Sequence, residues 1–501
     1  MLLLGLDIGT SSIKASVVDS NNLHCIASAQ YPETEAEIIA VESGWAEQSP
    51  EKWWEHAQLA ILKLHAQKKY NPDAIAAIGI AYQMHGLVVV DKQQQVLRNS
   101  IIWCDSRAVE IGDKAFATIG REKCLRHLLN SPGNFTASKL AWVKENEPDL
   151  YSKIYKIMLP GDFISMKLTG EITTSISALS EGVFWDFQEN GLSKDVFAYF
   201  SISPSFIPEI KEVFAEHGKV TATVASALSL REGIPVTYKA GDQPNNALSL
   251  NVLEPGEVAA TAGTSGVIYG ISDQLTYDNE SRINSFAHVN HRASSPSERV
   301  GGEVRVGVLL CINGTGILNR WVKNITGNKY SYTQINQLAG EVAPGSDGLT
   351  VLPFGNGAER MLNNKNIGAH ISDVDVNKHT EAHIFRAAQE GIAFAFRYGL
   401  DIMKENGMHP KVIRAGKANM FLSNVFSGSF VNTLNIPVEL YNCDGSVGAA
   451  TGAGIGSGIF SSAKEAFQNF KPVEIVEPGN INHEEHYQNW LGHLNRVLNR
   501  F

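Results

Sequence analysis

The chain opens with short apolar stretches separated by polar turns, the pattern of a β-sheet. Residues 2–6 are apolar, and apolar and polar residues alternate over 13–17 and again over 23–27. A period of two is typical of strands that bury one face. The tight polar turn Gly9-Thr10-Ser11-Ser12 separates the first two stretches. We therefore predict a three-stranded β-meander at the start of the chain.

Helical signals alternate with further strands. Ser49 and Pro50 can start a helix whose apolar face carries residues 53, 57, 60, 61 and 64. Other helices are expected over 380–407 and, with small residues, over 444–454. Strands are expected over 74–80, 88–90, 235–240 and 412–413. This alternation favours an α/β architecture.

The opening pattern returns near the middle of the chain. Residues 258–269 again read as an apolar strand, a Gly263-Thr264-Ser265 turn and a second apolar strand. A repeat at half the chain length, in 501 residues, predicts two domains of one design. We place them at 1–245 and 246–501. One difference is that Asp7 precedes the first turn, whereas the second copy has the neutral Thr261.

Composition narrows the possible functions. Apolar residues make up 44% of the chain and charged residues 19%, as in a folded globular protein. The net charge of −10 and the lack of a basic run argue against nucleic acid as a partner. No apolar stretch is long enough to span a membrane. Five scattered cysteines without a CxxC pair fit a reducing cytoplasm.

The two Gly-Thr-Ser turns are candidate phosphate sites, because backbone N–H groups and hydroxyls there can approach phosphate oxygens. The alternative is that they are ordinary hairpin turns. Neither matches the GxxxxGK[ST] or GxGxxG pattern. The candidates are Gly9, Thr10, Ser11, Gly263, Thr264 and Ser265.

Two aspartates lie at strand ends. Asp7 could hold hydrated Mg²⁺ beside the phosphates, or could cap its turn. Asp242 follows an apolar strand and could take the proton from an alcohol during phosphoryl transfer, with Gln243 binding a second hydroxyl. The alternative for Asp242 is an acid that ends a strand.

Two polar loops could bind the hydroxyls of a sugar. Gln83 and His85 lie in a polar insertion between two apolar strands. Asp105 and Arg107 follow the apolar pair at 101–102 and could bind hydroxyls, or could pair with each other. A single histidine is more often structural than functional.

In order and spacing, several motifs resemble those of the FGGY carbohydrate kinases, and within them the xylulokinase branch. The motifs are the stretches 6–11, 45–54, 83–86, 103–107, 135–143, 159–163, 167–170, 240–243, 263–266, 352–354 and 444–450.

This resemblance implies an actin-like fold, with two RNase H-like domains around a cleft. The sugar would bind to the N-terminal domain and ATP mainly to the C-terminal domain. The family pattern makes Asp242 the catalytic base and puts Asp7 near Mg²⁺. It also makes Met84 and His85 sugar contacts. Gly416, Lys417 and Asn419 would border the adenine.

The resemblance also narrows the acceptor. Met84-His85 stands where the glycerol kinase branch has Arg-Glu, which favours a ketose such as D-xylulose. The adenosine loop departs from the family pattern of three glycines followed by Ala-Arg-Ser, because here it reads Ala415-Gly416-Lys417-Ala418-Asn419. The alternatives are a kinase for another polyol, ketose or sugar acid, or a sugar-binding regulator. A chaperone-like ATPase is disfavoured. A homodimer is compatible with the prediction.

Overall fold

The first half of the chain forms a mixed five-stranded sheet. The computed structural model describes residues 1–293 and 303–500. Strand β1 pairs antiparallel with β2 and parallel with β5, and the sheet order is β13-β5-β1-β2-β3. The strands are β1 (Leu2–Ile8), β2 (Ile13–Asp19), β3 (Cys25–Tyr31), β5 (Ile75–Tyr82) and β13 (Val236–Gly241). The predicted three-stranded meander is confirmed.

The second half forms a seven-stranded sheet in the order β16-β17-β15-β14-β20-β21-β22. Its central hairpin, β14 (Val258–Ala262) and β15 (Gly266–Ser272), is antiparallel like β1 and β2. The two hairpins are the two copies of the sequence repeat. The remaining strands are β16 (Asn284–Ala287), β17 (Val306–Ile312), β20 (Ile413–Gly416), β21 (Val438–Tyr441) and β22 (Glu474–Val476).

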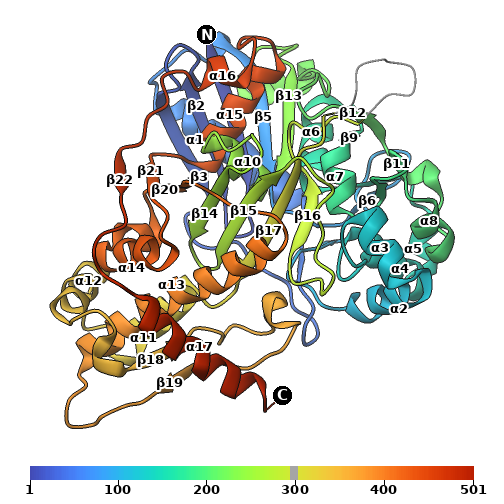
Figure 1. Ribbon diagram of the computed structural model, residues 1–501. Coiled ribbons are helices and arrows are strands. Elements are labelled where there is room, and N and C mark those ends of the chain that lie inside the picture. Colours follow the sequence, from blue (N-terminus) through green and yellow to red (C-terminus); the bar gives the residue numbers. More distant parts are fainter. Residues whose placement is uncertain (294–302, 501) are drawn as a thin grey trace.

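Each sheet has helices on both faces (Figure 1). Helices α1 (Pro50–Ala66) and α15 (Gly445–Gly456) contact the N-terminal sheet, and α13 (Glu381–Glu405) contacts the C-terminal one. The short helix α10 (Asp242–Ser249) touches α15 on one side and β14 and β15 on the other. Helices α10 and α15 therefore lie between the two halves. The predicted helices from Ser49, Thr380 and Asp444 are all present.

Helix α15 crosses from the C-terminal half onto the N-terminal sheet, and its small residues explain how it fits. A β-carbon on Gly5 would overlap the carbonyl oxygen of Ser446, and one on Gly79 would overlap that of Ala449. Backbone therefore packs directly on backbone at these two points. The many glycines and alanines of 444–454 serve this close contact.

A helical insertion separates β5 from β13, which the sequence pattern did not resolve. Its helices include α2 (Val109–Ile119), α3 (Arg121–Leu128), α4 (Thr136–Asn146), α6 (Pro160–Thr169), α7 (Ile176–Glu181) and α8 (Lys194–Phe200). Helix α7 meets the edge of the C-terminal sheet. There the Ser177 hydroxyl donates to the Ala287 carbonyl at 2.8 Å, and the Ala287 N–H donates to the Ser180 hydroxyl at 2.9 Å. The insertion thus joins the two halves.

Candidate active site

The centre of the candidate site is where β1 ends and two helices begin. Asp7 is the next-to-last residue of β1 and lies opposite Lys14 on β2. Asp242 is the first residue of α10, directly after β13. Helix α15 begins at Gly445, whose backbone lies against the Asp7 carboxylate, where a β-carbon would collide with Oδ2. Helices α10 and α15 thus both begin beside Asp7, and their positive ends favour negative charge there.

Burial and mutual repulsion control the protonation of these acids. Burial, and then the charges of Asp242 and Asp444, raise the pKa of Asp7 to about 7, although Lys14 opposes the shift. Burial raises the pKa of Asp242 to about 6, against hydrogen bonds from Gln243. A divalent cation at Asp7 would relieve this repulsion.

Asp444 and Lys14 link the two halves beside Asp7. The Lys14 ammonium forms an ion pair with Asp444, the N-cap of α15. Burial works against ionisation of Asp444, but hydrogen bonds from Lys14 and Ser446 hold its pKa below the ordinary value. Asp444 lies in the motif 444–450 but has no predicted role, and Lys14 was not predicted. The signal for Lys14 was its place opposite Asp7 in the hairpin.

A set of amide hydrogen bonds connects the first turn to the predicted sugar loop. The Thr10 hydroxyl donates to Oε1 of Gln83 at 3.1 Å, and the Gln83 amide donates to Oε1 of Gln48 at 3.0 Å. The Gln48 amide in turn donates to the Thr10 carbonyl oxygen at 2.8 Å. Gln83 is only 2% exposed. The predicted phosphate turn and sugar loop therefore form one connected unit.

His85 lies in a buried aromatic setting. Its ring centroid is 4.8 Å from that of Phe135 and 5.3 Å from that of Phe286, which belongs to the C-terminal sheet. Burial lowers its pKa to about 3, so the ring is neutral. The Lys139 ammonium donates to the His85 carbonyl at 2.9 Å. Sequence reasoning missed Phe286, which stands out in no local pattern. Lys139 lies in the motif 135–143 but was given no role there.

Asp105 and Arg107 form the pair that the sequence left open as one alternative. The guanidinium group of Arg107 donates to Asp105 at 2.7–3.0 Å and to Glu47 at 2.7 Å. It also lies 3.8 Å from the centre of the Trp45 ring. The Asp105 and Arg107 side chains are 0% and 1% exposed. Their hydrogen-bonding groups therefore face one another in the interior.

A cavity of about 600 Å³ lies beside the second turn. Gly263 and Thr264 line it together with Asn419. The N–H of Gly316, at the start of α11 (Gly316–Ile325), donates to the Gly263 carbonyl at 2.9 Å. The cavity also has walls that sequence reasoning missed, namely Arg320, Tyr332, Asn336 and Gln337. Its volume is in the range of small-ligand sites.

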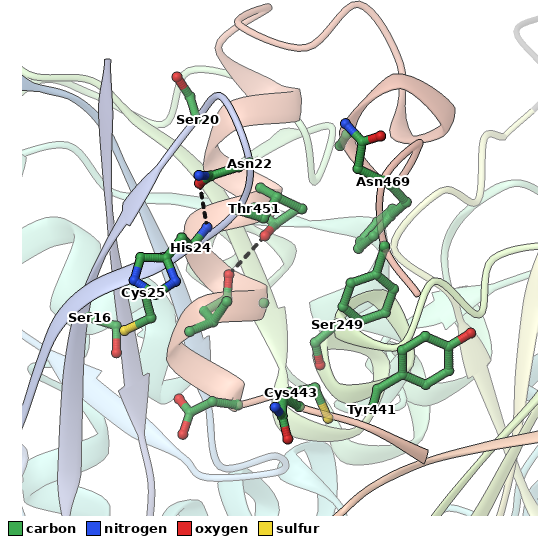
Figure 2. A pocket seen from close by; sticks show the side chains of 18 of the residues that line it. Ser16, Ser20, Asn22, His24, Cys25, Ser249, Tyr441, Cys443, Thr451 and Asn469 are labelled. Atoms are coloured by element: carbon green, nitrogen blue, oxygen red, sulfur yellow. Dashed lines mark hydrogen bonds between the residues drawn. The ribbon is translucent and has the colours of Figure 1, made fainter. Parts of the chain in front are cut away.

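Lys417 and Asn419 are on opposite sides of their loop. The Lys417 ammonium pairs with Glu474 at 2.8 Å, and Lys417 lines a different hollow, of about 980 Å³. Figure 2 shows this hollow, with Ser16 and Cys25 on one side and Tyr441 and Cys443 on the other. The structure thus brings Asn419, and not Lys417, to the cavity at the second turn.

Comparison with known proteins identifies the class. The model of the N-terminal domain of the FGGY family of carbohydrate kinases matches residues 2–249, and the C-terminal model matches 258–454. The chain belongs to this family and is a sugar kinase with two RNase H-like domains in the actin-like arrangement. The described residues contain no helix able to span a membrane.

Its relatives include several xylulose kinases. That of Bacillus subtilis is 29% identical over 93% of this chain and 90% of its own. That of Escherichia coli is 25% identical over 97% and 95%. The solved xylulose kinase from Rhodospirillum rubrum is 25% identical, with a TM-score of 0.85 over 99% of both chains. A gluconate kinase from Lactobacillus acidophilus has the same fold, with a TM-score of 0.88 at 20% identity, over 99% of this chain and 98% of its own.

Proposed function

We propose that this kinase transfers the γ-phosphoryl group of ATP to a ketose, and that D-xylulose is the acceptor. The observation that carries the proposal is the position of Asp242, a partly buried carboxylate at the start of α10 and beside Asp7. The xylulose kinase relatives support the choice of sugar.

In the proposed reaction, the Asp242 carboxylate accepts the proton of the reacting hydroxyl. The hydroxyl oxygen forms a bond to the γ-phosphorus as the bond from that phosphorus to the ADP oxygen breaks, and ADP leaves with the electron pair. Because the pKa of Asp242 is about 6, the base is largely ionised at pH 7.5 and still basic enough to take a proton. The N–H groups of the two Gly-Thr-Ser turns are proposed to bind phosphate oxygens.

The Asp7 carboxylate is suited to binding a magnesium ion that enters together with the nucleotide. No group of three potential metal-ligating side chains gathers anywhere in residues 1–293 and 303–500. Mg²⁺ is often bound by one or two carboxylates together with substrate phosphates and water, and Asp7 suits this role. The bound ion would offset negative charge on the phosphates.

A panel of acceptors tests the proposal. Release of ADP is measured with ATP, Mg²⁺ and each of D-xylulose, D-ribulose, glycerol and D-gluconate, and ³¹P NMR identifies the product. We expect the highest kcat/KM with D-xylulose. A higher kcat/KM with a polyol or a sugar acid than with D-xylulose would reassign the acceptor. Sugar binding without turnover in calorimetry would instead indicate a regulator.

Asp242→Asn tests the base. We expect sugar and ADP to bind as in the wild type and kcat to fall about 10²–10⁴-fold, since this is the usual contribution of one positioned base. Asp273→Asn, at an exposed position, is the matched control. Wild-type turnover in Asp242→Asn would remove Asp242 from the role.

A further inference from the structure

Glu181 is a buried acid close to the predicted sugar residues, and neither the sequence motifs nor the proposed reaction gives it a role. It is the last residue of α7 and is 1% exposed. A β-carbon on Gly241 would lie 2.7 Å from Oε2 of Glu181 and 2.6 Å from Cγ of Met84. The Glu181 carboxyl, the Met84 side chain and the residue before Asp242 therefore meet at one point.

Glu181 also holds the turn that carries His85. The backbone of His85 has φ of 63°, a left-handed conformation that is uncommon for a residue other than glycine. Nδ1 of His85 lies 3.0 Å from the carbonyl oxygen of Glu181. The Tyr82 hydroxyl and the backbone of His85 lie close enough to the Glu181 carboxyl to lower its pKa, while its Oε1 has no partner within hydrogen-bond distance. One residue thus contacts the imidazole, the backbone of the turn and the end of β5.

We propose that Glu181 is a positioning residue for the sugar acceptor, which fixes the left-handed turn at His85 and so presents Met84 and His85 to the sugar. This inference rests on the proposed function, because it takes Met84 and His85 as sugar contacts. A turn of this kind persists only when its surroundings hold it. Removing the Glu181 carboxyl takes away the acceptor that faces the His85 backbone and frees the turn to relax.

The surroundings of the Glu181 carboxyl favour its neutral form. Burial, and then the charges of Asp242 and Asp162, hold the pKa of Glu181 well above its ordinary value, against hydrogen bonds from Tyr82 and His85. Across the packed elements, the charged and titratable groups that act on it or respond to it are Asp242, Asp162, Tyr82, His85, Lys139 and Tyr269. A neutral amide of the same shape keeps an acceptor oxygen facing Tyr82 and His85, so glutamine should replace Glu181.

Two substitutions test the proposal in the full chain. Glu181→Gln should keep the KM for the acceptor and kcat within about threefold of wild type. Glu181→Leu, of similar size but without a polar oxygen, should raise the acceptor KM at least about tenfold. Its KM for ATP and its affinity for ADP should not change. Glu189→Leu, in the same insertion but exposed, should behave as wild type.

A general structural role would give a different result. If Glu181→Leu raises the KM for ATP in parallel, or leaves the acceptor KM within twofold, the proposal is overturned. The proposal is also overturned if Glu181→Gln raises the acceptor KM as much as Glu181→Leu does. Should Glu181→Leu not fold, Tyr82→Phe removes only a hydroxyl that contacts the carboxyl. It should raise the acceptor KM several-fold, and an unchanged KM would overturn the proposal.

The result is separable from the test of the proposed function. If wild-type protein binds sugar but transfers no phosphate to any acceptor, the proposed reaction fails. The same variants are then compared by calorimetric affinity for D-xylulose. Weaker binding in Glu181→Leu with restored binding in Glu181→Gln would support the inference, and equal binding in all would refute it.

Discussion

Asp7→Asn should make the nucleotide-free protein more stable at high pH, although it removes a residue of the proposed active site. The pKa of Asp7 is raised from 3.8 to about 7 in the folded protein. The folded state therefore holds this proton more tightly than the unfolded chain does. The stability associated with the proton is fully present below pH 4 and is lost as the pH rises through about 7. Asparagine stays neutral and avoids this loss.

The size of the effect follows from the shift. Each tenfold change in an acid dissociation constant corresponds to about 1.36 kcal/mol, so a rise in the pKa from 3.8 to about 7 is worth about 4 kcal/mol above pH 7. Burial is the largest cause, and the charges of Asp242 and Asp444 add to it. We expect a net increase of about 2–4 kcal/mol at pH 8 and much less at pH 5.

The assay is urea unfolding of wild type and Asp7→Asn at pH 5 and pH 8. The exposed replacement Asp273→Asn serves as control, and its difference from wild type should not change with pH. Adding ADP with Mg²⁺ should stabilise wild type more than Asp7→Asn, because the cation would offset the charge of Asp7. A difference between wild type and Asp7→Asn that is the same at both pH values would refute this account of Asp7.

Two further predictions concern the base and the packing. In the free enzyme, kcat/KM for the acceptor should rise with pH through about 6 and then level off, because Asp242 must be ionised to act as a base. A flat profile of kcat/KM from about pH 5 to 8 would contradict this role. Gly79→Ala should destabilise the protein by about 1–3 kcal/mol or more in urea unfolding, because the new methyl overlaps the backbone of α15. Gly492→Ala, in α17 (Glu484–Leu498) with open space around it, should instead be neutral or slightly stabilising.

The sequence located most of the candidate site because its residues lie in short local motifs. Asp7 lies near the end of an apolar strand, Asp242 directly follows one, and both Gly-Thr-Ser turns join two strands. Glu181 was missed for the opposite reason. It ends a six-residue helix in the insertion, and only the folded chain brings it beside Gly241.

The sequence by itself determined the local elements and the repeat. Apolar alternation defines the strands of both hairpins, and caps such as Ser49 define where helices begin. These features depend on neighbours along the chain, so they can be read from it.

The tertiary structure decided which distant groups meet. It placed α15 on the sheet of the other half, paired Arg107 with Glu47, and turned Lys417 toward Glu474. Such contacts depend on the shape and charge of segments that are far apart in the chain, so a local sequence pattern does not predict them. The protonation of Asp7 and Asp242 also belongs to this level, because burial raises the pKa of both.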